Sequence, residues 1–193
     1  MAPGSGIKIL GISGSLRKAS LNTGLLRSAE KAIPEGVEFT IADISGLPML
    51  NQDLEGKGPN GVIEFPEVVE AWRKQVAGAD AILFSSPEYN YGLTAALKNA
   101  IDWASRPPNA WDDKPAAIVG AGGGVKAYQS NRVLRLSGIF LNLHFINKPE
   151  TQFAIRDPGL FDWSTGDLLT EEGNQRVADT VTALVAWTKR LQQ

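Results

Sequence analysis

Residues 13–23, which read SGSLRKASLNT, could hold an anion. They offer hydroxyls, an amide and a guanidinium, from Ser15, Ser20, Thr23, Asn22 and Arg17. The segment runs into a helical stretch, and the free N–H groups of a helix start attract anions. Neither GxxxxGK[ST] nor GxGxxG occurs, which argues against a Walker loop and a dinucleotide fingerprint. A mononucleotide phosphate is therefore favoured; the alternative is an ordinary Ser/Asn-rich turn with Asn22 as the helix cap.

A second segment, residues 85–92, reads SSPEYNYG and also precedes a helical pattern. Pro87 stiffens the backbone, so the N–H groups that follow, beginning with that of Glu88, can face the edge of a flat heteroaromatic ring. Tyr89 and Asn90 could add stacking or amide contacts. In the alternative interpretation, the tyrosines only cover the start of the helix.

The third segment, residues 120–124, reads GAGGG and follows an apolar run. Glycines such as Gly122 and Gly123 let a backbone approach a ligand closely. A tight turn from strand to helix would also need one or two glycines, so this segment gains weight only together with the other two.

The elements around these segments alternate between short apolar runs and helical spacing, which is typical of an α/β protein with a parallel sheet. Unbroken apolar runs predict three central strands, and alternating patterns predict two edge strands: 7–12, 81–84 and 116–119, then 37–41 and 141–145. Helices are expected at 22–34, 65–78, 93–105, 126–140 and 171–192, with irregular stretches at 43–64 and 150–170. The doubly wound order 2-1-3-4-5 would bring all three segments to one crevice at the carboxyl ends of the strands.

Composition excludes several other chemistries. The chain has 193 residues, no Cys, one His and a formal net charge of −2. There is no thiol nucleophile, no multi-histidine metal site, and no basic excess for nucleic acid. No run approaches the roughly 20 apolar residues of a membrane span, and no signal peptide is evident. We expect a cytoplasmic single domain over residues 1–193, with residues 1–6 flexible.

Three motifs in combination resemble the NADPH-dependent FMN reductase family. They are GSLRKASLN at 14–22, SPEYN at 86–90 and LKNAIDW at 97–103. The nearest likeness is to the FMN-dependent chromate and quinone reductases, supported by LP at 47–48, NQDLE at 51–55 and NKPE at 147–150. The resemblance covers about residues 7–150. Two departures are LTAA at 93–96, where relatives carry Pro-Gly, and KAYQ at 126–129.

The resemblance implies a flavodoxin-like fold that binds FMN. It assigns the FMN phosphate to Ser15, Arg17, Ser20, Asn22 and Thr23. It places Pro87, Glu88, Tyr89 and Asn90 along the isoalloxazine, with Gly122 and Gly123 on the other side. Such enzymes pass electrons from NADPH or NADH through FMN to quinones and, promiscuously, to chromate, azo compounds or free flavin. No catalytic side chain is implied, because the protein positions the cofactor and backbone N–H groups stabilise its negative charge.

Two other functions remain open. One is a flavodoxin-like electron carrier reduced by a protein partner, against which Arg17 and the mild net charge weigh. The other is a non-catalytic flavin-binding module.

Several residues invite ordinary explanations. His144 is expected at the surface or at an interface, and Trp103 in the core. The acidic pairs 112–113 and 171–172 have no metal-ligand spacing and are expected in a loop and at a helix start.

The resemblance also implies a homodimer or homotetramer. Tyr128 and Arg132 lie four residues apart on one helix face, and we expect them, with Glu150, to meet a neighbouring subunit near its flavin. The alternative is a solvated helix face.

Overall fold

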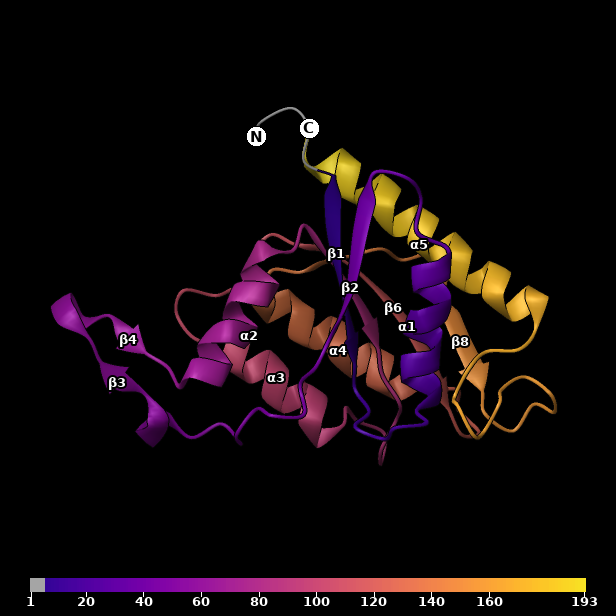
Figure 1. Ribbon diagram of the computed structural model, residues 1–193, viewed down its shortest axis with the longest axis horizontal. Helices are drawn as coiled ribbons and strands as arrows, with labels where there is room; N and C mark the ends of the chain where they lie inside the picture. Colours follow the sequence, from indigo (N-terminus) through magenta and orange to yellow (C-terminus); the bar gives the residue numbers. More distant parts are fainter. Residues whose placement is uncertain (1–5) are drawn as a thin grey trace.

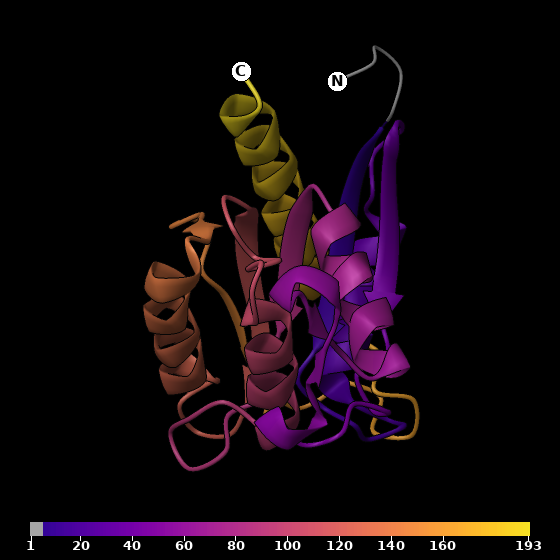
Figure 2. The ribbon, with the colours of Figure 1, turned by 90° about the vertical axis from the view of Figure 1, so that its left-hand side faces the viewer.

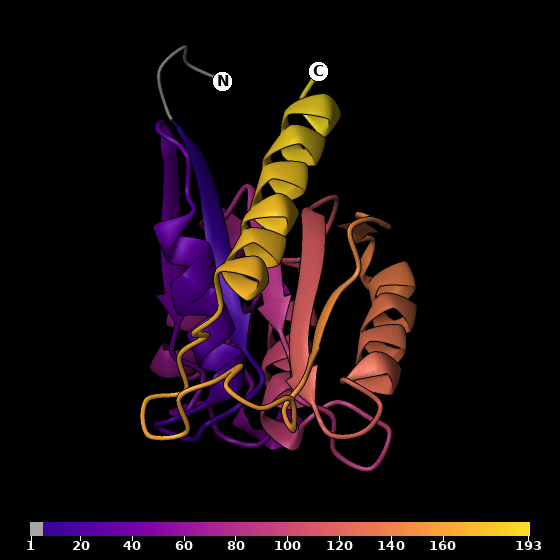
Figure 3. The same cartoon turned by 90° about the vertical axis from the view of Figure 1, so that its right-hand side faces the viewer.

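The computed structural model describes residues 6–193, which form a parallel sheet between two layers of helices (Figures 1–3). Residues 1–5, which hold most of the segment expected to be flexible, lie outside the described residues. The strands run in the order β2-β1-β5-β6-β7, which confirms the expected doubly wound topology. Their bounds are β1 Ile7–Ser13, β2 Val37–Ala42, β5 Ala81–Ser85, β6 Pro115–Gly122 and β7 His144–Phe145, and β8 (Thr151–Ala154) also pairs with β6.

Helices cover both faces of this sheet. One face carries α1 (Leu21–Lys31) and α5 (Glu171–Leu191); the other carries α2 (Glu67–Gly78), α3 (Ala95–Ser105) and α4 (Tyr128–Leu141). Every residue of β5 and β6 is buried, as expected for central strands between two helical layers, whereas β2 is half exposed at the edge. The sheet alternates its side chains between two cores: Leu10 of β1 packs beneath α2 and α3, and Ile9 packs beneath α1 and α5.

The fifth strand differs from the expectation. An edge strand was expected at 141–145, but α4 continues to Leu141 and ends at Asn142, whose φ of 58° is left-handed. Only the two residues of β7 pair with the start of β6, and β8 takes over beside Val119–Gly122. The expectation of an irregular 150–170 is therefore wrong at its beginning. The short strands β7 and β8 both pair with the long strand β6. A strand of four residues, such as β8, is too short for its alternating pattern to be recognised in the sequence.

The stretch 43–64 is irregular over most of its length, as expected, but it also holds short elements. It contains the hairpin β3 (Gly56–Lys57) and β4 (Ile63–Glu64) and two short 3₁₀ turns, η1 (Gln52–Leu54) and η2 (Pro59–Gly61). The hairpin projects from the body of the molecule (Figure 1). Arg106 holds it through a bidentate ion pair with Glu55, at 2.5 and 2.9 Å.

The structure also places three features for which ordinary explanations were expected. Trp103 is fully buried, and its indole donates to the Pro48 carbonyl at 2.7 Å. His144 is half-buried beside Asp113, with Nε2 and Oδ1 2.7 Å apart. The Glu171–Glu172 pair occupies the first turn of α5. Within residues 6–193, no helix has the length and apolar character needed to cross a membrane.

Candidate functional site

The three segments predicted to bind a ligand leave the sheet side by side. The Gly14 N–H donates to the Ser85 carbonyl at 2.8 Å, and the Ser86 N–H donates to the Val119 carbonyl at 3.4 Å. The loops after β1, β5 and β6 therefore begin together at the carboxyl ends of these strands, where the strand order reverses between β1 and β5 (Figure 3). This is the position at which a doubly wound fold is expected to bind its ligand.

The loop after β1 uses its hydroxyls to shape itself. Ser20 is the cap of α1, because its Oγ accepts from the Thr23 N–H at 3.2 Å. Thr23 Oγ1 donates to Ser13 Oγ at 2.9 Å, and the Ser15 N–H donates to the same oxygen at 3.2 Å. The alternative interpretation was thus right that the helix is capped, but wrong in naming Asn22 as the cap.

The same loop keeps donors for a ligand. Within residues 6–193, the backbone N–H groups of Lys18, Ala19 and Ser20 have no protein acceptor, and the Arg17 guanidinium has no carboxylate partner. The first N–H groups of α1 are free, as at any helix start. An exposed guanidinium next to several free N–H groups can bind a phosphate through charge and hydrogen bonds.

Asn22 has a structural role that sequence reasoning missed. Its side chain is buried; Nδ2 donates to the Ala121 carbonyl at 3.0 Å, and Oδ1 accepts from the Ala121 N–H at 3.0 Å. Ser85 Oγ donates to the same Oδ1 at 3.2 Å. The amide therefore ties α1 to β5 and β6, and only its backbone N–H is left for the phosphate. No local signal could reveal partners 63 and 99 residues away.

The loop after β5 makes a tight turn. Tyr89 and Gly92 exchange backbone hydrogen bonds of 3.2 and 2.9 Å around Asn90 and Tyr91, whose φ values are 52° and 60°. Left-handed backbone is unusual for a bulky residue such as Tyr91, and such strain concentrates at functional sites. Tyr89 and Tyr91 are 54% and 69% exposed. They are therefore free to meet a ligand instead of covering α3.

Glu88 points its carboxylate at α4. Oε2 accepts from the Gln129 N–H at 2.7 Å and from the Ser130 N–H at 3.2 Å. Helix α4 begins after Ala127, which has no side-chain hydrogen bond to offer the helix start, so Glu88 supplies the cap from another loop. The backbone N–H groups of Glu88 and Asn90 have no acceptor in the described part of the chain. Glu88 can therefore serve a ring ligand through its backbone, while its side chain supports α4.

The two candidate glycines of the third loop, Gly122 and Gly123, differ in the space around them. A Cβ on Gly122 would lie 2.5 Å from the Ala127 nitrogen, so this glycine is required for packing against the start of α4. A Cβ on Gly123 would meet nothing within 4 Å. Gly123 is therefore the position where a ligand could approach the backbone.

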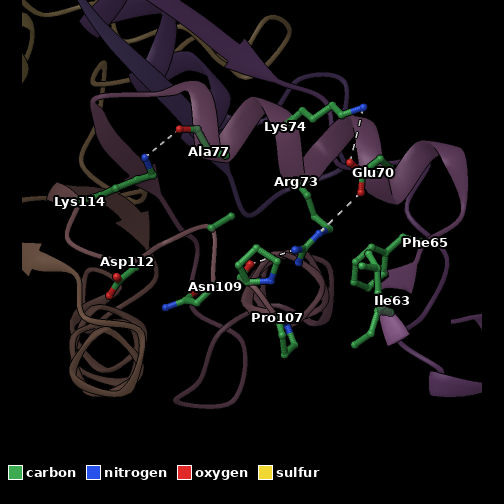
Figure 4. A pocket seen from close by; sticks show the side chains of 13 residues that line it. Ile63, Phe65, Glu70, Arg73, Lys74, Ala77, Pro107, Asn109, Asp112 and Lys114 are labelled. Carbon is green, nitrogen blue, oxygen red and sulfur yellow. Dashed lines mark hydrogen bonds and ion pairs between the residues drawn. The ribbon is translucent and has the colours of Figure 1, made fainter. Parts of the chain in front are cut away.

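A cleft of about 460 Å³ lies elsewhere, between α2 and residues 107–114 (Figure 4). Its cations support helix ends: Arg73 donates to the carbonyls of Trp103 and Arg106, at 3.1 and 2.6 Å, and Lys114 donates to that of Ala79 at 2.7 Å. Burial lowers the pKa of both Arg73 and Lys114. Because these groups satisfy carbonyls of the chain itself, the cleft is a weaker candidate than the three loops.

Comparison with known proteins decides among the families that this fold could represent. The sequence profile of the NADPH-dependent FMN reductases matches residues 7–157. The chain belongs to this family. It is 49% identical over 191 residues to the NADPH:quinone oxidoreductase of Arabidopsis thaliana, covering 96% of this chain and 94% of that protein. It is 43% identical over 187 residues to an NAD(P)H-dependent FMN reductase of Pseudomonas aeruginosa, with 96% and 97% covered.

Solved structures agree with the family assignment. The chain is similar to the flavoenzyme NAD(P)H:(acceptor) oxidoreductase FerB from Paracoccus denitrificans, with a TM-score of 0.80, 29% identity, and coverage of 95% of this chain and 98% of that one. An archaeal flavodoxin shares only 10% identity at a TM-score of 0.60, with 95% and 99% covered. The second likeness supports the flavodoxin-like fold alone.

Proposed function

We propose that the chain is an FMN-dependent NAD(P)H:quinone oxidoreductase. The observation that carries the proposal is that three loops begin side by side where the strand order reverses, and that two of them have unpaired backbone N–H groups. The chain also belongs to the FMN reductase family. Quinones are the favoured acceptors because relatives at 49% and 51% identity are named quinone oxidoreductases.

The first loop fits the FMN phosphate. The unpaired N–H groups of residues 18–20 and the free start of α1 provide donors, and Arg17 provides charge. Ser15 Oγ is a further donor at the same turn, while the hydroxyls of Ser20 and Thr23 hold the loop in shape. A phosphate here would meet donors that have no acceptor in the chain, which is the arrangement anions favour at helix starts.

The second and third loops fit a flat ring. The unpaired N–H groups of Glu88 and Asn90 lie on a turn stiffened by Pro87, and a Cβ on Gly123 in the third loop would meet nothing within 4 Å. FMN, when bound, supplies the electron transfer between nicotinamide and acceptor. The chain orients the ring and stabilises its negative charge through those N–H groups. No acid or base side chain is needed.

An open ring face would select acceptors by access and redox potential. Tyr89 and Tyr91 are exposed on the turn that follows β5, where they can contact an acceptor. Chromate, azo compounds and free flavin are therefore proposed as promiscuous acceptors. NADPH and NADH are both proposed as donors, and a cytoplasmic location stays a prediction.

Self-association is proposed on a different surface. The outer face of α4 exposes a run of large apolar side chains, Val133, Leu136, Ile139 and Phe140, and Phe140 is 89% exposed. Exposed apolar patches of this kind mark protein contacts. A homodimer or homotetramer that covers this face accords with the expectation from the family. Tyr128 bonds to Glu150 within the chain at 2.8 Å, so the expected contact of these residues with a neighbour stays a prediction.

The deciding experiment is anaerobic addition of NADPH to the purified, FMN-loaded protein. We expect the yellow flavin band to bleach rapidly and to return when a quinone is added. An electron carrier would keep its colour until a reductase protein was supplied. Failure of the purified protein to take up FMN would overturn the proposal.

A further inference from the structure

The segment between β8 and α5 folds into a loop that contacts the start of α1. Phe161 and Leu168 pair as an isolated β-bridge, and both side chains are buried in the core beneath α1 and α5. Figures 1 and 3 show the segment beside the start of α1. We call residues 161–168 the bridge loop. It lies beyond residues 7–157, which match the family profile, so the profile does not describe it.

The bridge loop touches the candidate phosphate loop through Gly166. The φ of Gly166 is 84°, and a Cβ there would lie 2.5 Å from the Ser20 carbonyl oxygen and 3.0 Å from the Ala19 carbonyl carbon. A Cβ on Gly24 of α1 would in turn collide with the Gly166 carbonyl. Backbone therefore packs directly on backbone, at a separation that two glycines allow.

Hydrogen bonds fix the bridge loop in this position. Arg27 Nε donates to Asp167 Oδ1 at 2.6 Å, and Arg27 Nη2 donates to the Thr165 carbonyl at 2.8 Å. Inside the loop, the Asp162 N–H donates to the Asp167 carbonyl at 2.9 Å, and the Gly166 N–H donates to the Asp162 carbonyl at 2.7 Å. The loop is therefore bonded both internally and to α1, about one turn beyond the contact of Gly166.

The backbone that Gly166 contacts belongs to the residues that offer donors to the FMN phosphate. The N–H groups of Lys18 and Ala19 have no acceptor in the described part of the chain. The beginning of the phosphate loop is held elsewhere, because the Gly14 carbonyl accepts from Thr94 Oγ1 at 2.6 Å. The contact with Gly166 supports the other end, next to the start of α1.

We propose that Gly166 is a positioning residue for FMN, because the bridge loop holds residues 18–20 in the conformation that receives the phosphate. Donors that are already in place lose little conformational entropy when the ligand binds. The phosphate is then bound more tightly and released more slowly, so FMN stays on the protein between turnovers. This inference rests on the proposed function, since it requires FMN to place its phosphate at this loop.

The test compares FMN with riboflavin, which carries the same ring without the phosphate. Each is titrated into the flavin-free protein while flavin fluorescence is followed. Gly166→Ala should weaken FMN binding at least about tenfold and speed its release, and should change riboflavin binding by less than about twofold. A general structural defect would weaken both flavins alike. Equal losses for the two flavins, or no loss for FMN, would overturn the proposal.

Gly159→Ala is the matched control. Gly159 lies in the same connection with a φ of 71°, so an alanine there brings similar backbone strain. A Cβ on Gly159 would nevertheless meet nothing within 4 Å. FMN should bind to this variant as it does to the unmodified protein. If Gly159→Ala loses as much FMN affinity as Gly166→Ala, strain rather than the contact is responsible and the proposal is wrong.

Asp167→Asn tests the bridge loop without altering the contact, and it decides if Gly166→Ala does not fold. The substitution weakens the bond to Arg27 and removes a negative charge. Electrostatics alone would then favour an anionic phosphate, whereas a displaced loop disfavours it. We expect FMN binding to weaken about threefold or more. Unchanged or tighter binding would overturn the role of the loop.

These results separate the two proposals. If the unmodified protein takes up no FMN, the proposed function fails. If it takes up FMN and NADPH bleaches the flavin, but Gly166→Ala binds FMN as tightly, only the role of the bridge loop fails.

Discussion

Asn22 shows how one side chain can organise a site without touching a ligand. Its amide satisfies both backbone groups of Ala121 and also accepts from Ser85. These contacts join the start of α1 to the ends of β5 and β6, from which the other two loops depart. One buried amide therefore contributes to the relative placement of all three loops, beside the backbone hydrogen bonds that join Gly14 to Ser85 and Ser86 to Val119.

We predict that Asn22→Ala destabilises the protein by roughly 2–4 kcal/mol, because it leaves the N–H and the carbonyl of Ala121 unpaired in the interior. FMN affinity should fall as well, since the loops lose their common tie. Urea denaturation and flavin fluorescence titration measure the two effects. Asn51→Ala is the matched control, because Asn51 is exposed and bonds only to the neighbouring Asp53 N–H. A loss of stability no larger than in the control would show that the tie is unimportant.

Glu88 connects the loop after β5 to α4, much as Asn22 connects α1 to β5 and β6. Its carboxylate caps α4, and its own backbone N–H lies in the loop that fits the flavin ring. A shift of α4 would therefore displace the loop after β5 at the candidate site.

We predict that Glu88→Ala costs about 1–3 kcal/mol, since a charged acceptor at a helix start is lost, and that Glu88→Gln costs less. Amide hydrogen exchange at Gln129 and Ser130 should accelerate in Glu88→Ala. Glu171→Ala is the control, because α5 keeps its own cap, Thr170. Unchanged exchange at the start of α4 would count against the capping role.

The contact between α1 and the segment before α5 should depend on pH. Arg27 donates to Asp167 at 2.6 Å, and this hydrogen bond lowers the pKa of Asp167 below its ordinary 3.8. Because the folded state binds this proton less tightly than the unfolded state, the pair stabilises the protein fully above the ordinary pKa. The stabilisation is lost as the pH falls through the lowered folded-state value.

We therefore predict that the stability difference between the unmodified protein and Asp167→Asn is constant above about pH 5 and shrinks at lower pH. Urea midpoints measured from pH 3 to pH 7 test this prediction. A difference that grows on acidification would have the wrong sign and would contradict the assignment.

At the scale of the whole molecule, the described residues include an apolar surface that no other element covers. It runs along α4, where Leu136, Ile139 and Phe140 are 68%, 78% and 89% exposed. The opposite face of the same helix packs on the sheet through Leu134 and Leu141. An interface on α4 would thus attach to an element that also borders the candidate site.

We predict that Leu136→Glu shifts the protein toward the monomer, because a charge would be buried in the subunit contact. Light scattering coupled to size-exclusion chromatography measures the mass. Met49→Glu is the control, since Met49 is exposed but lies outside α4. Arg132→Ala tests the expected contact of Tyr128, Arg132 and Glu150 in the same assay. An unchanged mass for Leu136→Glu would place the interface elsewhere.

The alternation of apolar runs and helical stretches determined the sheet order, the two helical layers and the edge at which the three loops meet. These features follow from patterns within about ten residues, which burial on one or both faces imposes on each element. The motifs of the loops identified the family for the same reason, because each motif is a continuous segment.

Only the tertiary structure decided what the polar side chains do. Asn22 and Glu88 were expected beside a ligand, but their side chains bond to backbone groups 99 and 41 residues away. The split edge strand likewise depends on segments distant in sequence, because β7 and β8 both pair with β6. Local spacing determines which element a residue joins, whereas its hydrogen-bond partner is determined by which elements pack together, and packing is a property of the whole chain.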